Sequence, residues 1–476
     1  MPTENNGAGT GEYRVEKDSL GDVQVPQDAL YGAQTARAIR NFPITGLRPH
    51  PTMVKATVLV KRAAAETNRD LGVLDAERAD AIMAAADRVL AGELLDQWRV
   101  DPIQAGAGTS HNMNTNEVLA NMANEALGGN RGEYRPINPN DHVNMAQSTN
   151  DVFPTAMRVA ALLQLRELYP ELERLQKAFA DKGREFDRII KSGRTHMQDA
   201  VPIRLGQEFT AYSITLGKMR RKIEHAAEAM LELNIGATAA GTGLNSDPRY
   251  QEAVVKKLSE LTGLPLQPAG HLVEMTQTQY AMAEAHGALK LLALELTRIA
   301  NDLRLMSSGP QTGLAEIVLP PVQPGSSIMP GKVNPVMAEM LNMACFQVIG
   351  NDTTITMAVQ AGQLELNVMM PVMAFDMLMS IDILKNSMRV FAEFCVEGIT
   401  ANEERCRQYV ENSMGLVTAL NPHIGYSAAA KVAQENYRTG RPIRDIVRDM
   451  GVLSDEQLEE ILDPVAMTEP GIPGRR

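Results

Sequence analysis

Residues 276–306, TQTQYAMAEAHGALKLLALELTRIANDLRLM, are apolar around most of a helical circumference, and residues 364–394 share this property. A helix that is apolar on all sides is buried on all sides. At 1.5 Å per residue, each of these stretches of roughly 30 residues spans about 45 Å. A chain of 476 residues can hardly cover rods of that length by itself. We therefore expect a bundle of long helices that other subunits complete.

Other parts of the chain also have helical periodicity. From Ala156 to Phe179, apolar residues recur every three or four positions, which is one face of a helix. Residues 209–233 predict a further long helix, and shorter ones are expected at 51–72 and 75–90. The chain is too long for one ordinary domain. We predict an all-α protein with an N-terminal domain over residues 1–149, a central long-helix bundle over 150–404 and a small helical domain over 405–476.

The composition excludes several classes of protein. A formal net charge of -12 argues against nucleic acid and anionic membranes as partners. The N-terminus is polar, and no apolar run reaches membrane length. The three cysteines are far apart and form no CxxC pair, so neither a zinc site nor a disulfide framework is indicated. These features predict a cytoplasmic protein with no membrane partner.

A polar loop, GSSIMPGKVNP, covers residues 325–335. Its glycines allow backbone N–H groups to turn toward a ligand, and clustered N–H groups form a concavity that holds anions. Lys332 adds a positive charge. A phosphate-binding loop needs four residues between its glycines and a hydroxyl after the lysine. Here five residues intervene and Val333 follows, so the loop suits a small polyanion of another kind.

Three more polar clusters interrupt helical sequence. They are Gly106–Ser110 with the nearby Asn112 and Asn114, Gln147–Asp151, and Gly193–Asp199. Each alone has an ordinary explanation, because Ser, Thr and Asn before a helix are most often caps. His196 alone is more often structural, and Lys332 alone is more often a surface charge. Together, the clusters supply hydroxyl and amide groups, one histidine and one lysine without metal-ligand spacing. This set predicts recognition of two carboxylates with no metal and no cofactor.

The sequence around these clusters resembles the aspartase/fumarase superfamily. SSIMPGKVNP is similar to the signature of that superfamily, and GAGTSHNMNTNEV, NDHVNMAQSTNDVFPTA and GRTHMQDAVPIRLGQEF resemble its other active-site regions in the same order. The similarity extends from Val15 to the C-terminus. Fumarases typically carry GSGTQ, QSSND and NPTQCE, whereas this chain has GAGTS, QSTND and NPVMAE. These details favour the aspartases, although Met370 stands where aspartases often carry a glutamate.

The resemblance implies a carbon–nitrogen lyase that reversibly converts L-aspartate to fumarate and ammonia. A proton leaves the β-carbon, and an enediolate (aci-carboxylate) intermediate forms. Two alternatives remain open: a fumarate hydratase, which adds water to give L-malate, and a catalytically idle structural protein on the same scaffold.

The resemblance also implies roles for individual residues. Thr109, Ser148, Thr149 and Ser327 resemble the group that holds the β-carboxylate; Thr195, Lys332 and Asn334 resemble the group that holds the α-carboxylate; Asn150 and His196 resemble the contacts to the amino group. Ser326 matches the catalytic base. A serine base needs a depressed pKa, which N–H groups and the charge of Lys332 can provide. His196 is the rival base, because histidine titrates near neutrality, and Glu339 could pair with it.

The four clusters are far apart in the sequence, on loops that long rods would keep distant within one subunit. The superfamily builds each site from three subunits of a homotetramer. The resemblance therefore implies a homotetramer in which the clusters of different subunits meet.

Overall fold

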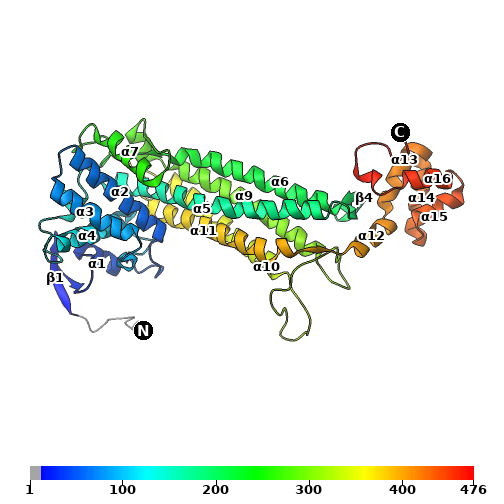
Figure 1. The fold of residues 1–476 in the computed structure, drawn as a ribbon, viewed down its shortest axis with the longest axis horizontal. Coiled ribbons are helices and arrows are strands. Elements are labelled where there is room, and N and C mark those ends of the chain that lie inside the picture. The colour runs from blue at the N-terminus through cyan, green and yellow to red at the C-terminus, as the bar shows by residue number, and fades with distance from the viewer. Residues whose placement is uncertain (1–11, 476) are drawn as a thin grey trace. The chain divides into compact units, whose positions relative to one another are not determined.

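The computed structural model describes residues 12–475 and contains two compact units (Figure 1). Unit 1 comprises the described residues up to Tyr169, together with Arg221–Leu291 and Phe346–Leu384. Unit 2 comprises Pro170–Arg220, Leu292–Cys345 and the described residues from Lys385 onward. Helices dominate both units, and every sheet in the described chain is a pair of strands. The predicted all-α class is confirmed. The three predicted domain boundaries stay predictions.

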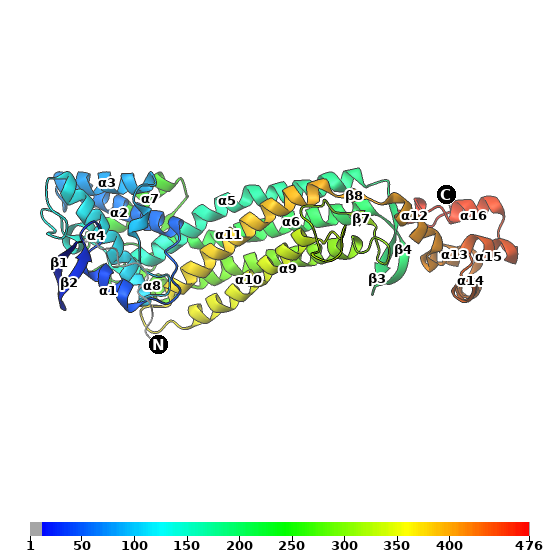
Figure 2. The same cartoon turned by 90° about the horizontal axis from the view of Figure 1, so that it is seen from below.

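Unit 1 begins with a hairpin and continues into packed helices. Its elements are β1 Tyr13–Asp18, β2 Gly21–Pro26, α1 Ala33–Asn41, α2 Pro51–Asp70, α3 Ala76–Leu90, α4 Thr109–Ala126, a π-helix at Pro139–Val143, β5 Glu232–Leu233, α7 Tyr250–Thr262, β6 Gln267–Pro268 and α8 Leu272–Gln277. Figure 2 shows β1 and β2 beside α1, and Figure 1 shows α2, α3 and α4 together. Pro51 occupies the first turn of α2, where its missing N–H costs nothing.

The core of unit 1 lies between α2, α3 and α4. It contains aliphatic side chains such as Val58 and Ile82 around the buried ring of Trp98. The indole Nε1 donates to Thr115 Oγ1 at 2.9 Å, so the only polar atom of this ring is satisfied. This core fixes α4, the helix that follows the first polar cluster.

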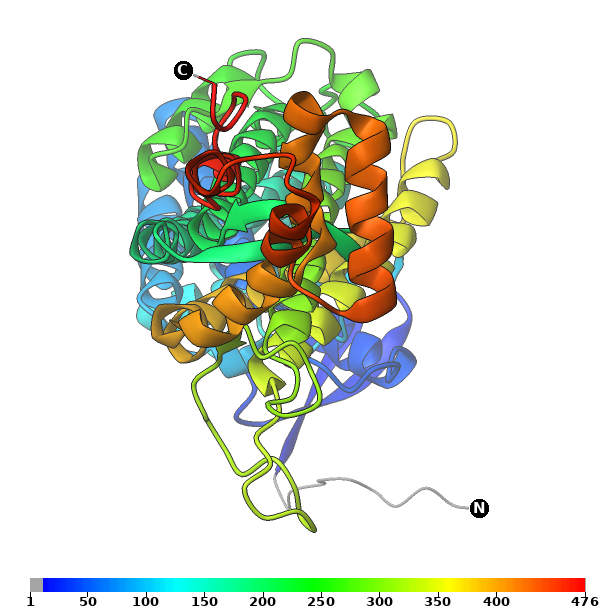
Figure 3. The ribbon, with the colours of Figure 1, turned by 90° about the vertical axis from the view of Figure 1, so that its right-hand side faces the viewer.

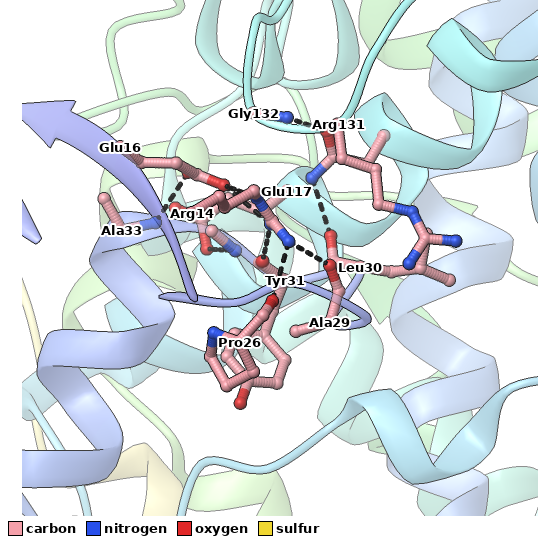
Figure 4. A network of polar contacts seen from close by, with 12 residues as sticks. Arg14, Glu16, Pro26, Ala29, Leu30, Tyr31, Ala33, Glu117, Arg131 and Gly132 are labelled. Atoms are coloured by element: carbon pink, nitrogen blue, oxygen red, sulfur yellow. Dashed lines mark hydrogen bonds and ion pairs between the residues drawn. The ribbon is translucent and has the colours of Figure 1, made fainter. Parts of the chain in front are cut away.

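Buried charges fasten the N-terminal hairpin to the rest of unit 1 (Figure 4). The Arg14 guanidinium donates to the carbonyl oxygens of Pro26, Ala29 and Tyr31, each at 2.8 Å. The Glu117 carboxylate of α4 accepts the N–H groups of Gly32, Gln34 and Thr35 at 2.9–3.1 Å. Because the first N–H groups of a helix have no partner within it, Glu117 satisfies the start of α1. Burial nevertheless raises the pKa of Glu117 to about 7.

Five long helices contribute residues to both units in the described chain. They are α5 Thr149–Glu185, α6 Leu205–Ala227, α9 Tyr280–Met306, α10 Val336–Gln360 and α11 Met370–Phe394. The stretch 276–306 was expected to be one helix, but α8 ends at Gln277 and Thr278 is extended, with ψ 145°. Leu292, Leu296 and Leu303 of α9 are fully buried. None of the helices in the described residues is long and apolar enough to cross a membrane.

Unit 2 contains a hairpin and a cluster of short C-terminal helices. Its remaining elements are β3 Ile190–Thr195, β4 Gln198–Arg204, β7 Ile317–Val318, β8 Thr400–Ala401, α12 Glu403–Asn412, α13 Val417–Ile424, α14 Tyr426–Thr439, α15 Ile443–Met450 and α16 Asp455–Ile461. Figure 3 shows the C-terminal helices gathered together in orange and red. They enclose a core of their own, which includes Leu420, Val432 and Leu462. Short 3-10 turns complete the chain at Leu95–Gln97, Gly106–Gly108, Glu228–Met230, Val396–Gly398, Met414–Leu416 and Ala466–Thr468.

Candidate active site

The predicted site residues divide between the two units. Thr109, Ser148, Thr149 and Asn150 belong to unit 1, whereas Thr195, His196, Ser326, Ser327, Lys332 and Asn334 belong to unit 2. Each unit therefore holds two of the four polar clusters.

The first cluster is a tight turn that leads into α4. Ala107 and Gly108 have positive φ angles of 59° and 82°, and the N–H of Ala107 donates to the carbonyl of Val368 at 2.7 Å. A Cβ at position 108 would lie 2.1 Å from the ring of Phe153, so only glycine fits there. Thr109 then opens α4. The sequence predicted a polar cluster at Gly106–Ser110 that interrupts helical sequence, but α4 begins within it.

The second cluster is held by a buried carboxylate at the start of α5. Asp151 accepts the N–H of Ser148 at 2.9 Å with one oxygen, and the N–H groups of Gly236 and Thr238 at 3.1 and 2.9 Å with the other. Asp151 is fully buried, and burial raises its pKa to about 7. It ties the second cluster to the turn at 236–238.

The hydroxyl groups of the second cluster act as acceptors toward the protein. Ser148 Oγ accepts the N–H of Asn150 at 3.2 Å, and Thr149 Oγ1 accepts Asn112 Nδ2 at 3.1 Å. The hydrogen of each hydroxyl is therefore available for a ligand. Asn150 Nδ2 donates to the carbonyl of Ala239 at 2.7 Å, which leaves its Oδ1 as an acceptor.

A cleft of about 420 Å³ lies beside this cluster within unit 1. Its lining includes Asn112, Ser148, Thr149, Thr238 and Asn245. The cleft is mostly bounded by small polar side chains and is large enough for a small dicarboxylate. Thr109 starts α4 three residues before Asn112, and it does not itself line the cleft in the described residues.

Sequence reasoning missed a lysine behind this cleft. Lys61 of α2 is fully buried and donates to Asn144 Oδ1 and Gln147 Oε1 at 2.8 and 2.9 Å. The signal was present, because Lys61 interrupts an apolar stripe that includes Val54, Val58 and Ala65 at helical spacing. A lysine in such a stripe is buried with its helix and needs polar partners.

The third cluster forms the tip of a β-hairpin in unit 2. Thr195 ends β3 and Gln198 begins β4, so His196 and Met197 alone make the turn. Both have positive φ angles, 54° and 63°, as the turn favoured by two-residue hairpins requires. Side chains other than Gly, Asn or Asp are strained there, and such strain concentrates at functional sites. Thr195 and His196 are both exposed. The sequence predicted the cluster but not the hairpin.

Buried ion pairs hold the base of this hairpin. The Glu316 carboxylate, which is fully buried, pairs with Arg194 at 2.8 Å and with Lys191 at 3.1 Å. Lys191 also pairs with Glu208 at 3.0 Å. These contacts fix the strands while leaving the tip free to meet a ligand.

The fourth cluster is the loop at 325–335, which projects from the body of unit 2 (Figures 1 and 3). Ser326 Oγ accepts the N–H groups of Ile328 and Met329 at 3.3 and 2.9 Å. Asn334 Nδ2 donates to the carbonyl of Gly325 at 2.6 Å, and the N–H of Gly325 donates to the carbonyl of Lys332 at 3.0 Å. The loop is therefore closed at its base. Ser327 and Lys332 are exposed.

The structure brings together the members of each cluster. Among the described residues, neither candidate base, Ser326 or His196, is paired with a side chain that could activate it. Within this part of the chain, the His196 side chain has no hydrogen bond or ion pair, and none joins it to Glu339 in the first turn of α10. Ser326, in contrast, has two backbone donors on its oxygen.

Comparisons with known proteins identify relatives of this chain. Residues 21–350 match the family model described as "Lyase", and residues 416–469 match "Fumarase C C-terminus". An aspartate ammonia-lyase of Bacillus subtilis (strain 168) is 54% identical over 467 residues, which is 98% of each chain. An aspartate ammonia-lyase of Escherichia coli (strain K12) is 49% identical over 98% of each chain.

Two solved structures are also similar. A fumarate lyase:delta crystallin from Brucella melitensis bound to cobalt superposes with a TM-score of 0.94 at 48% identity, and a class II fumarase from Schistosoma mansoni superposes with a TM-score of 0.94 at 38% identity. Each alignment covers 96% of this chain and 100% of the other.

Proposed function

We propose that this chain, which belongs to the aspartase/fumarase superfamily of lyases, is an aspartate ammonia-lyase. It is a carbon–nitrogen lyase, because relatives named aspartate ammonia-lyase are 49–54% identical to it over nearly the whole chain. The observation that carries the finer assignment is the polarity of the second cluster. Ser148 and Thr149 keep hydroxyl hydrogens for a carboxylate, while Asn150 keeps an oxygen for an ammonium group. L-Aspartate has both groups.

The proposed reaction removes a proton from the β-carbon and then releases ammonia. The β-carboxylate gains a second negative charge as the enediolate forms. Fixed donors lower the barrier when they are directed at the charge that develops. We assign this role to the hydroxyl groups of Thr109, Ser148, Thr149 and Ser327. Thr195, Lys332 and Asn334 hold the α-carboxylate, and Asn150 and His196 contact the amino group.

Ser326 is the proposed base. The N–H groups of Ile328 and Met329 both point at its Oγ. Hydrogen bonds to the charged form of a group favour that form, so this arrangement favours a serine oxyanion. Lys332 supplies a positive charge on the same loop. His196 lies in a strained turn, and no residue in the described part of the chain pairs with its ring to activate it. It serves better as a contact to the amino group.

The proposed assembly is a homotetramer in which three subunits contribute to each site. Its support is the apolar surface that one chain leaves uncovered on its long helices. Met343, Phe346 and Met357 of α10 are exposed by 64%, 57% and 57%, and Leu291 and Leu294 of α9 are exposed by 40% and 47%. Large apolar side chains grouped on one helix indicate an interaction surface. Cys345, Cys395 and Cys406 are buried free thiols, which fits a reducing cytoplasm.

The direct test is an assay of the purified full-length protein. Incubation with L-aspartate should produce fumarate, seen as a rise in ultraviolet absorbance, and ammonia in equal amount. Incubation with L-malate should produce far less fumarate. Rapid fumarate formation from malate with none from aspartate would identify a fumarate hydratase instead. No reaction with either substrate would indicate a non-catalytic protein.

A further inference from the structure

Lys61 holds a buried set of amide side chains behind the cleft of unit 1. Its ammonium lies at hydrogen-bond distance from the side-chain oxygens of Asn144 and Gln147. Both of these partners are neutral amides and not carboxylates. Burial lowers the pKa of Lys61 to about 7, and the negative charge of Asp151 opposes this shift. A fully buried amine is costly, so its position calls for an explanation.

Lys61 determines which way its neighbours point. A charged ammonium donates three N–H groups and accepts none. The oxygens of Asn144 and Gln147 therefore face it, and their NH2 groups face away. Gln147 Nε2 accordingly donates to the carbonyls of Val143 and Met145 at 3.1 and 3.0 Å.

A chain of hydrogen bonds links Asn144 to the cleft. Asn144 Oδ1 also accepts Asn112 Nδ2 and Asn116 Nδ2, each at 3.2 Å. Asn112 Nδ2 in turn donates to Thr149 Oγ1 at 3.1 Å. With Asn112 as a donor, the hydroxyl of Thr149 cannot donate inward. Asn112 Oδ1 has no hydrogen-bond partner among the described residues. The Asn112 amide therefore keeps this orientation at the cost of an unpaired oxygen.

We propose that Lys61 is a positioning residue that makes the Thr149 hydroxyl a donor toward a carboxylate in the cleft. The inference rests on the proposed function, because it concerns how that site binds its dicarboxylate. Without Lys61, the Asn144 amide loses the contact that orients it. Asn112 can then turn its oxygen to Thr149. The Thr149 hydroxyl then donates to this oxygen, and its hydrogen no longer points into the cleft. The cleft loses one donor, and its affinity for carboxylates falls.

The experiment compares three variants of the full-length protein. Lys61→Met keeps the length of the side chain and removes its donors. Asn112→Asp places a carboxylate, which can only accept, beside the Thr149 hydroxyl. It reproduces the last step of the proposed change and decides the question if Lys61→Met does not fold. Asn116→Asp is the matched control, since Asn116 donates to the same oxygen of Asn144 but has no hydrogen bond to Thr149 among the described residues. The measurements are the Kd of succinate by calorimetry, kcat and KM for L-aspartate, and the melting temperature.

We expect the Kd of succinate to rise about 10- to 100-fold in Lys61→Met and Asn112→Asp, as for loss of one hydrogen bond to a charged group. We expect less than about 3-fold change in Asn116→Asp at a comparable loss of melting temperature. Equal succinate affinities in Asn112→Asp and Asn116→Asp would overturn the inference. If the wild type binds succinate but does not convert aspartate, the proposed function fails while the succinate comparison still decides the role of Lys61.

Discussion

Replacement of Ser326 by alanine tests the proposed chemistry most directly. The substitution removes one oxygen atom and the acceptor of the two N–H groups at 3.3 and 2.9 Å. A hydrogen bond to a charged group contributes about 1.5–3 kcal/mol, so two such donors stabilise the serine oxyanion by roughly 3–6 kcal/mol. Since 1.36 kcal/mol is a factor of ten, this stabilisation favours ionisation by about 10²- to 10⁴-fold.

The expected loss of turnover has the same size. General base catalysis contributes about 10²- to 10⁴-fold, so kcat for L-aspartate should fall at least about 100-fold in Ser326→Ala. Since Ser326 is not assigned to the carboxylates, KM should change less than about 3-fold. The assay follows fumarate absorbance under initial-rate conditions. The control is Ser327→Ala, which removes the same atom from the next residue. Because Ser327 is assigned to the β-carboxylate both before and while its charge grows, this variant should raise KM and should lower kcat by less than Ser326→Ala does.

Two outcomes would contradict the assignment of Ser326. One is a Ser326→Ala enzyme that keeps more than a few per cent of the wild-type kcat. The other is abolished turnover with intact binding in His196→Asn, together with loss of one limb of the pH–rate profile, which would make His196 the base. Asparagine suits position 196 in this test, because it tolerates the positive φ of 54° better than most residues.

Three further predictions concern stability and assembly. Gly108→Ala should destabilise the protein by about 1–3 kcal/mol more than Gly128→Ala, because both glycines have φ near 80° but only a Cβ at 108 meets a ring; urea unfolding measures the difference, and equal losses would contradict the account of the turn. Burial raises the pKa of Glu117 to about 7, so the folded state binds more protons than the unfolded state from about pH 4.5 to 7. The contribution of Glu117 to the free energy of unfolding is present at low pH and is lost as the pH rises through 7. The Glu117→Gln variant should show a smaller fall in the free energy of unfolding over this pH range. Ser326→Ala and His196→Asn subunits that are dissociated, mixed and reassembled should regain part of the wild-type activity, and no recovery in well-mixed tetramers would argue against shared sites.

The sequence predicted those features that depend on local pattern. The apolar pattern of residues 276–306 and 364–394 indicated long helices, which the structure confirms over Tyr280–Met306 of α9 and Met370–Phe394 of α11. The polar clusters were visible because Gly, Ser, Thr and Asn interrupt helical segments. The family followed from the order of these clusters. Apart from the order of the clusters, each of these signals lies within a short stretch of sequence.

Features that depend on contacts between distant segments were beyond sequence reasoning. The hairpin at 190–204 was missed, because its turn has His196 and Met197 at positive φ instead of the glycine or asparagine that normally marks such a turn. The start of α4 was missed because amide groups of its polar residues have partners in distant segments: Asn112 Nδ2 donates to Thr149 Oγ1, and Asn114 Nδ2 donates to the carbonyl of Gln97.

The composition of the site was thus determined by the sequence, whereas the direction of its hydrogen bonds was decided by the tertiary structure alone. A hydroxyl or an amide can donate or accept, and the sequence does not distinguish these states. Thr149 becomes a donor toward the cleft only because Asn112 faces it, and Asn112 faces it because Asn144 is turned by a lysine far away in the chain. Hydrogen-bond polarity is a property of a network, and a network exists only once the chain is folded.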